Sequence, residues 1–190
     1  MKFKRIKIVF NSPVILSFVF ISFAVMLIGY ITLGASNEFL FMTYHSSLKN
    51  PLTYIRFFTH VLGHAGWDHY IGNMAYILLL GPILEEKYGS KKILEVIVIT
   101  ALITSVINYI FFWNVALCGA SGVVFAFILL TSFTSFKDGE LPITFILVAI
   151  IFIGQQIYEG IFLQDNVSNL SHILGGIIGA TVGYNLNKKS

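Results

Sequence analysis

Six apolar runs, separated by polar or glycine-containing breaks, leave few architectures open to this chain. A hydrocarbon layer about 30 Å thick requires roughly 20 apolar residues for each helix that crosses it. With 56% hydrophobic and 11% charged residues, the chain lacks the balance of an ordinary soluble domain. The sequence therefore predicts an all-α membrane protein with six transmembrane helices. The predicted spans are 13–34, 67–84, 93–112, 120–133, 141–157 and 170–186.

The basic residues predict the orientation of these spans, because Lys and Arg collect in cytoplasmic segments. Of the 12 Lys and Arg residues, only Lys49 and Arg56 lie in the connection between spans one and two. The others precede span one, follow span six, or lie in the two connections that share their side. We therefore expect a cytoplasmic segment 1–12, a six-helix membrane domain 13–187 and a cytoplasmic tail 188–190. Spans two, four and six then begin at the external face.

The first apolar run has a second reading, as a cleavable signal peptide, because Lys and Arg precede it and small residues follow it. Signal peptides have a shorter apolar region of about 7 to 15 residues, which favours a retained helix. The net charge of +3 is spread over the flanks of the spans, so no nucleic-acid partner is expected.

Polar residues with catalytic potential lie at the starts of spans two, four and six. His69 and Asn73 share one helix face because they are four residues apart, Ser121 opens span four, and His172 opens span six. A serine hydroxyl becomes a nucleophile when a neutral imidazole accepts its proton. The Asn73 amide, the His69 ring and the backbone N–H of Ser121 could then stabilise an oxyanion. The sequence predicts a Ser–His pair at one depth of the membrane.

Glycines surround both residues of this pair. They are Gly119 and Gly122 beside Ser121, and Gly175, Gly179 and Gly183 after His172. The last three form a ridge without side chains that would let two helices approach closely, either for packing alone or to bring the pair together. The fourth run would rise only about 21 Å, so we expect Ser121 to lie recessed in a water-accessible cavity.

These motifs resemble those of the rhomboid intramembrane proteases. The resemblance is carried by residues 56–69 with Asn73, by Gly81, Glu85, Lys87, Gly89 and Ser90, by Gly-x-Ser-Gly at 119–122, and by His172 with Gly175 and Gly179. Four motifs in the right order form a specific signal. The resemblance implies that Ser121 is the nucleophile and His172 the general base, without a third acid. It also implies that His69 and Asn73 belong to the oxyanion hole, and that span five or the loop 161–169 moves to admit a substrate helix.

The chain departs from the family pattern at two positions. Ile55 replaces the tryptophan that often precedes the loop arginine, and Phe125 replaces the tyrosine that often follows the serine by four residues. Phe125 can still stack on His172, but it lacks a hydroxyl. The function implied is cleavage of single-span membrane proteins in or near the bilayer, with no cofactor and no metal. The expected location is a bacterial cell membrane, with the active site open to the external side.

Some individual residues are also compatible with other roles. A metal could bind His60, His64 and His69, but no cysteine joins them. Cys118 could be the nucleophile, although an isolated cysteine is more often an apolar filler, and Asp165 could complete a triad. The chain could also be a catalytically silent relative that binds membrane proteins, but such a relative would lack the Ser–His pair, which this sequence keeps. A small transporter would show an internal repeat, which the sequence does not contain.

Overall fold

The computed structural model describes residues 7–134, 140–162 and 169–187, and it is helical throughout these ranges apart from turns and connections. The elements, in chain order, are α1 (Pro13–Ile31), the π-helical turn η1 (Asn37–Phe41), α2 (Pro51–Thr59), the 3₁₀ turn η2 (His60–Leu62), α3 (Trp67–Tyr88), α4 (Ser90–Phe111), α5 (Ser121–Ser132), α6 (Ile143–Phe162) and α7 (Asn169–Asn187). The predicted all-α class is confirmed for the described residues.

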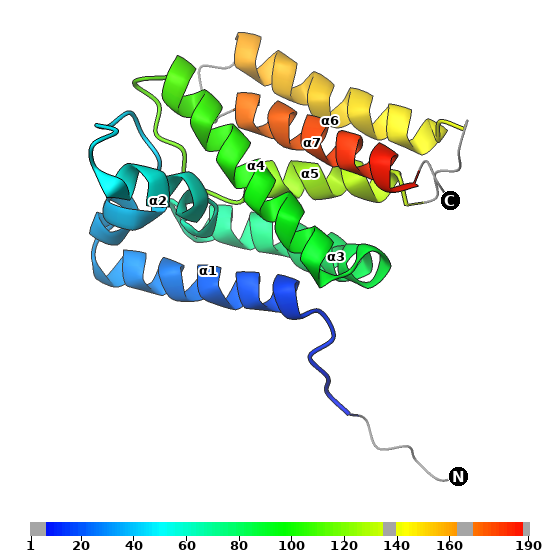
Figure 1. Cartoon of the computed structure of the whole chain (residues 1–190), viewed down its shortest axis with the longest axis horizontal. Coiled ribbons are helices and arrows are strands. Elements are labelled where there is room, and N and C mark those ends of the chain that lie inside the picture. The colour runs from blue at the N-terminus through cyan, green and yellow to red at the C-terminus, as the bar shows by residue number, and fades with distance from the viewer. Residues whose placement is uncertain (1–6, 135–139, 163–168, 188–190) are drawn as a thin grey trace.

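The long helices lie in a row, with α5 near the middle (Figure 1). Along this row α1 contacts α3, α3 contacts α5, α5 contacts α7, and α7 contacts α6, while α4 crosses the row and contacts α3, α5 and α7. Eight of the 12 residues of α5 are buried and none is exposed, whereas α6 exposes large apolar side chains such as Ile150 and Ile151. Such exposed apolar surface suits lipid, as expected for an integral membrane protein.

Six helices overlap the six apolar runs, with shifted ends. Three of them, α1, α4 and α6, are long and apolar enough to cross a membrane by length and composition, and α5 is a shorter apolar helix. The first helix ends at Ile31 instead of residue 34, because the chain turns at Leu33 (φ 52°) and Gly34 (φ 91°). The helix α6, which corresponds to the fifth predicted span, ends at Phe162, five residues beyond the predicted end.

The connection between α1 and α3, which none of the predicted spans covers, contains two regular elements of its own, α2 and η2. Pro51 at the first position and the Asn50 side chain, which accepts a hydrogen bond from the Leu52 N–H at 3.0 Å, start α2. An antiparallel bridge between Thr43 and Leu117 joins this connection to the segment before α5.

The first helix is part of the folded core. Ile15 is fully buried against Gly81 of α3. The buried Glu85 carboxylate accepts hydrogen bonds from the backbone N–H groups of Val14 and Ile15, each at 3.0 Å. It also accepts one from the Ser90 hydroxyl at 2.6 Å. One carboxylate therefore caps α1 and ties it to the turn between α3 and α4.

Candidate active site

Ser121 is the first residue of α5, and the backbone just before it is shaped by glycine. Gly119 has a φ of +135°, a conformation that residues with side chains rarely adopt. A Cβ atom there would lie 2.5 Å from Cε1 of His69, so the His69 ring rests directly against this backbone. The N–H of Gly119 donates to the carbonyl of His60 at 2.9 Å. The start of α5 is thus fixed between the α1–α3 connection and the first turn of α3.

The glycine ridge of α7 packs against α5. A Cβ atom at Gly175 would lie 2.0 Å from the carbonyl oxygen of Gly122, and one at Gly179 would lie 2.0 Å from that of Ala126. Both contacts advance by four residues in the same direction, so α5 and α7 run parallel in register. This close contact is the most extensive between any two helices of the described structure.

His172 belongs to α7, and its ring packs against the face of α5 that carries Ser121. Its ring stacks on Phe125, with centroids 4.5 Å apart and planes at 3°, which confirms the predicted stacking. Phe125 follows Ser121 by four residues, so both side chains project from one face of α5. One turn after His172, Gly175 contacts Gly122, the residue after Ser121. The imidazole therefore stacks on a side chain that lies one helical turn from Ser121 on the same face of α5.

The helix α6 supplies a hydrogen-bond partner for His172 that was not among the predicted site residues. The carbonyl of the Gln156 side chain, from α6, lies 2.5 Å from Nδ1 of His172. Gln156 is 4% exposed, whereas its neighbours on α6 are half-buried or exposed. The available signal was an amide inside an otherwise apolar span, because polar side chains at membrane depth usually have a partner.

Asn73 presents an unpaired donor in the same region. Its side chain is 7% exposed, and its amide nitrogen has no hydrogen-bond partner among the residues that the structure describes. A buried amide without a partner costs roughly 1–3 kcal/mol, which a protein tolerates where a ligand or reaction intermediate completes the bond. His69 lies one helical turn before Asn73, so both predicted oxyanion donors face one side of α3.

The three histidines weighed as a metal site have other neighbours. Nδ1 of His60 lies 3.3 Å from the Arg56 carbonyl, and Nδ1 of His64 lies 3.3 Å from the Leu62 carbonyl. The His64 ring meets the His69 ring edge to face at 5.2 Å. Within the described ranges, no group of three or more His, Cys, Asp or Glu side chains is close enough to hold a metal. The histidines brace the connection between α1 and α3.

Burial of two of these histidines predicts that acid destabilises the fold. Burial lowers the pKa of His60 to about 4, and burial together with the nearby His69 lowers the pKa of His64 to about 4, against 6.5 for an exposed histidine. The unfolded chain therefore binds more protons between these values. We expect the melting temperature in detergent to be highest above about pH 6.5 and to fall as the pH drops toward 4.

A matched variant separates this effect from the titration of carboxylates. His60→Asn keeps an amide nitrogen near the position of Nδ1 but cannot gain a proton at these pH values. Its melting temperature should fall less between pH 7 and pH 4 than that of the wild type. Equal slopes for both proteins would show that the burial of His60 does not control acid stability.

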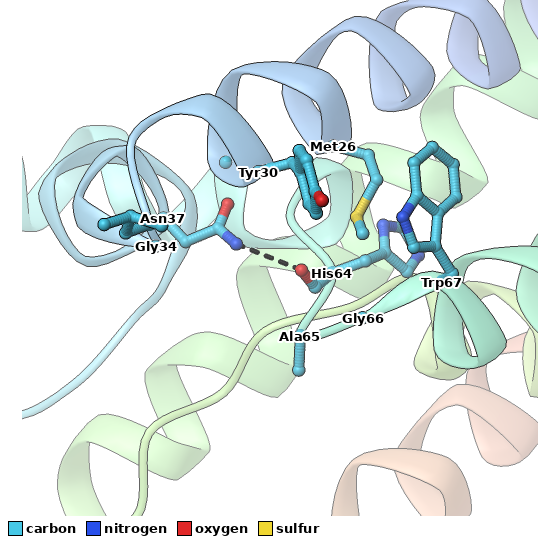
Figure 2. A pocket seen from close by; sticks show the side chains of 10 residues that line it. Met26, Tyr30, Gly34, Asn37, His64, Ala65, Gly66 and Trp67 are labelled. Atoms are coloured by element: carbon cyan, nitrogen blue, oxygen red, sulfur yellow. Dashed lines mark hydrogen bonds between the residues drawn. The ribbon is translucent and has the colours of Figure 1, made fainter.

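A cavity of about 470 Å³ lies beside this connection and does not include Ser121 or His172 (Figure 2). Met26 and Tyr30 of α1 lie on one side of it, and Trp67 at the start of α3 lies on the other. The Asn37 amide nitrogen donates to the His64 carbonyl at 3.0 Å across its base. This bond ties η1 to the segment that leads into α3, and so helps to position His69.

The remaining alternatives receive less support. Burial raises the pKa of the Cys118 thiol to about 12, so it stays protonated and is a poor nucleophile at neutral pH. Asp165, the residue considered for a triad, lies outside the described residues. Arg56 donates from Nε to the Phe39 carbonyl at 2.9 Å, and its guanidinium lies over the Tyr44 ring. These two contacts of Arg56 anchor the connection between α1 and α3. Ile55, which stands where the family pattern often has a tryptophan, is 44% exposed.

Comparison with known proteins gives a consistent result. Residues 51–189 match the family model described as Rhomboid domain. Mouse rhomboid-related protein 2 is 31% identical over 157 residues, which cover 72% of this chain and 52% of that protein. Rhomboid-related protein 1 of Caenorhabditis elegans is 30% identical over 138 residues, covering 68% of this chain and 39% of that protein. Rhomboid protease GlpG of Haemophilus influenzae is 24% identical over 157 residues, covering 80% of each chain. The chain thus spans about half the length, or less, of the first two relatives.

Proposed function

Because this chain belongs to the rhomboid family, we propose that it is an intramembrane serine protease that cleaves single-span membrane proteins in or near the bilayer. One observation carries the proposal. The ring of His172 stacks on Phe125, one helical turn from Ser121 on the same face of α5. This arrangement gives the serine hydroxyl a base at the start of a buried helix.

The proposed reaction has two stages. His172 accepts the proton of the Ser121 hydroxyl as the oxygen attacks the scissile carbonyl, and the resulting oxyanion is stabilised by donors around it. The imidazolium then gives its proton to the leaving amine, and the C–N bond breaks. Water deprotonated by His172 attacks the acyl-enzyme, which releases the second product and restores Ser121. No metal or cofactor enters either stage.

The proposed oxyanion hole combines side chains and backbone. The Asn73 amide supports this role because it is buried and lacks a partner among the described residues. The His69 ring lies against Gly119, two residues before Ser121. Backbone N–H groups at the start of α5 add the positive end of a helix dipole. These donors come from two helices that contact each other.

We further propose that all six helices cross the membrane, with both termini cytoplasmic and the active site open to the external side. The distribution of Lys and Arg supports this orientation. The α5 helix has 12 residues and rises about 18 Å, so its start would lie below the membrane surface. We propose a bacterial cell membrane as the location, because the Haemophilus influenzae protein is matched over a larger share of its length than the two animal relatives.

The test of the proposal is cleavage of a model single-span substrate by the purified protein in detergent. The same preparation should react with a serine-directed fluorophosphonate, and peptide mapping should place the label on Ser121. Absence of both cleavage and labelling in a folded preparation would contradict the proposal.

Asn73→Ala should lower kcat by roughly tenfold to a thousandfold, because one donor to the oxyanion is lost. Asn73→Asp is the matched control for shape: it keeps the size of the side chain but replaces the donor by an acceptor, so it should be at least as slow. The melting temperature of Asn73→Ala should remain near the wild-type value, because the amide nitrogen has no partner to lose among the described residues. Unchanged turnover in both variants would remove Asn73 from the mechanism.

A further inference from the structure

We propose that Gln156 is a positioning residue for the general base, and that Glu159 fixes the orientation of its amide. The inference rests on the proposed protease function and adds a third helix to the site. It concerns how the neutral His172 ring is held so that Nε2 stays available to accept a proton.

The first step is the burial of Gln156. In α6, every residue of which is described, it is the single buried residue. The helix contacts only α5 and α7 among the described elements, and its other faces carry exposed apolar side chains. Packing alone would favour an apolar residue at this one buried position. The amide is instead placed against the imidazole of His172, at 2.5 Å from Nδ1.

The second step is the direction of the amide. The nitrogen of Gln156 donates to one carboxylate oxygen of Glu159 at 3.2 Å, and the exposed Gln155 donates to the other oxygen at 2.8 Å. A carboxylate can only accept, so the NH₂ group of Gln156 must face Glu159. The carbonyl oxygen of Gln156 must then face His172, which removes the usual ambiguity between the two ends of an amide.

The third step is the tautomer of the base. A carbonyl oxygen accepts but does not donate, so Nδ1 of His172 carries the proton in this contact. In a neutral imidazole the other nitrogen, Nε2, is then unprotonated and can take the proton of the serine. When the ring becomes charged during the reaction, the same carbonyl accepts a stronger hydrogen bond from Nδ1. A neutral amide thus holds the base in the way that the aspartate does in serine protease triads.

The central test compares Gln156→Leu with Gln155→Leu in the full-length protein. Gln156→Leu keeps a similar volume and removes the acceptor, so kcat should fall roughly tenfold to a hundredfold while KM changes less than about twofold. The fluorophosphonate should label Ser121 more slowly by a similar factor, since this small probe reports on the base and not on substrate docking. Gln155→Leu removes the exposed amide that bonds the other Glu159 oxygen but leaves the bond from Gln156 to Glu159 and the contact with His172 in place, so both rates should fall much less than in Gln156→Leu.

A second pair keeps the inference testable if Gln156→Leu fails to fold. Glu159→Gln retains an oxygen that can accept from the Gln156 amide, whereas Glu159→Leu does not. We expect slower labelling of Ser121 in Glu159→Leu than in Glu159→Gln. Wild-type labelling rates in a folded Gln156→Leu protein, or equal rates in the two Glu159 variants, would overturn the inference. A wild-type protein that neither cleaves nor labels would instead contradict the proposed protease function.

Discussion

Ser121→Ala and His172→Ala should each lower the cleavage of a single-span substrate by at least about a thousandfold. The first variant removes the attacking oxygen, and the second removes the group that accepts its proton. Because the two residues act as one unit, the double variant should be no slower than the slower single variant. The measurement is the initial rate of cleavage by purified protein in detergent, with fluorophosphonate labelling as a second readout.

Matched substitutions show whether the loss is specific to the pair. Ser132→Ala removes the serine at the other end of α5, whose hydroxyl bonds the Ile128 carbonyl of its own helix. His45→Ala removes an exposed histidine that stacks on Tyr109 and Trp113, away from α7. Both control variants should cleave within about threefold of the wild type. If cleavage survived in Ser121→Ala or in His172→Ala, the dyad would be ruled out as the catalytic unit.

The position of Ser121 could be predicted because several local rules agree there. A glycine at 119 permits the turn with positive φ, the apolar run starts directly after it, and α5 begins at Ser121 itself. The glycines of α7 predicted a close contact between two helices, and the structure shows that the partner is α5. These predictions depend on backbone shape and spacing, which a sequence displays directly.

The contact of α6 with the base could not be predicted in the same way. Three polar side chains of α6, Gln155, Gln156 and Glu159, lie within about one helical turn, so their spacing alone does not say which of them faces the protein. Gln155 and Gln156 are adjacent amides, and only the packed structure shows that Gln156 faces His172 while Gln155 is exposed. The sequence does not predict the short helix α2 for a different reason, since nine residues give too short a pattern to separate a helix from a loop.

A substitution in the glycine ridge that packs α7 against α5 should produce the second large effect, a loss of stability. A Cβ atom at Gly179 would lie 2.0 Å from the carbonyl oxygen of Ala126, which is backbone and cannot rotate away. The helices would have to separate by more than 1 Å, roughly, to restore ordinary contact distances. Overpacking of this kind costs about 1–3 kcal/mol and more where backbone is the obstacle. Gly179→Ala should therefore lower the melting temperature by several degrees or more.

The neighbouring Gly176 provides the control that makes this prediction sharp. A Cβ atom there would lie 3.6 Å from the nearest atoms of Leu129, an ordinary contact, and alanine is the better helix former by roughly 0.5–1 kcal/mol. Gly176→Ala should therefore match or exceed the wild-type melting temperature. Separation of α7 from α5 should also pull the His172 ring off Phe125, so Gly179→Ala should lose activity even in the fraction that stays folded. If both variants melted and cleaved alike, the ridge would not be what holds the base beside Ser121.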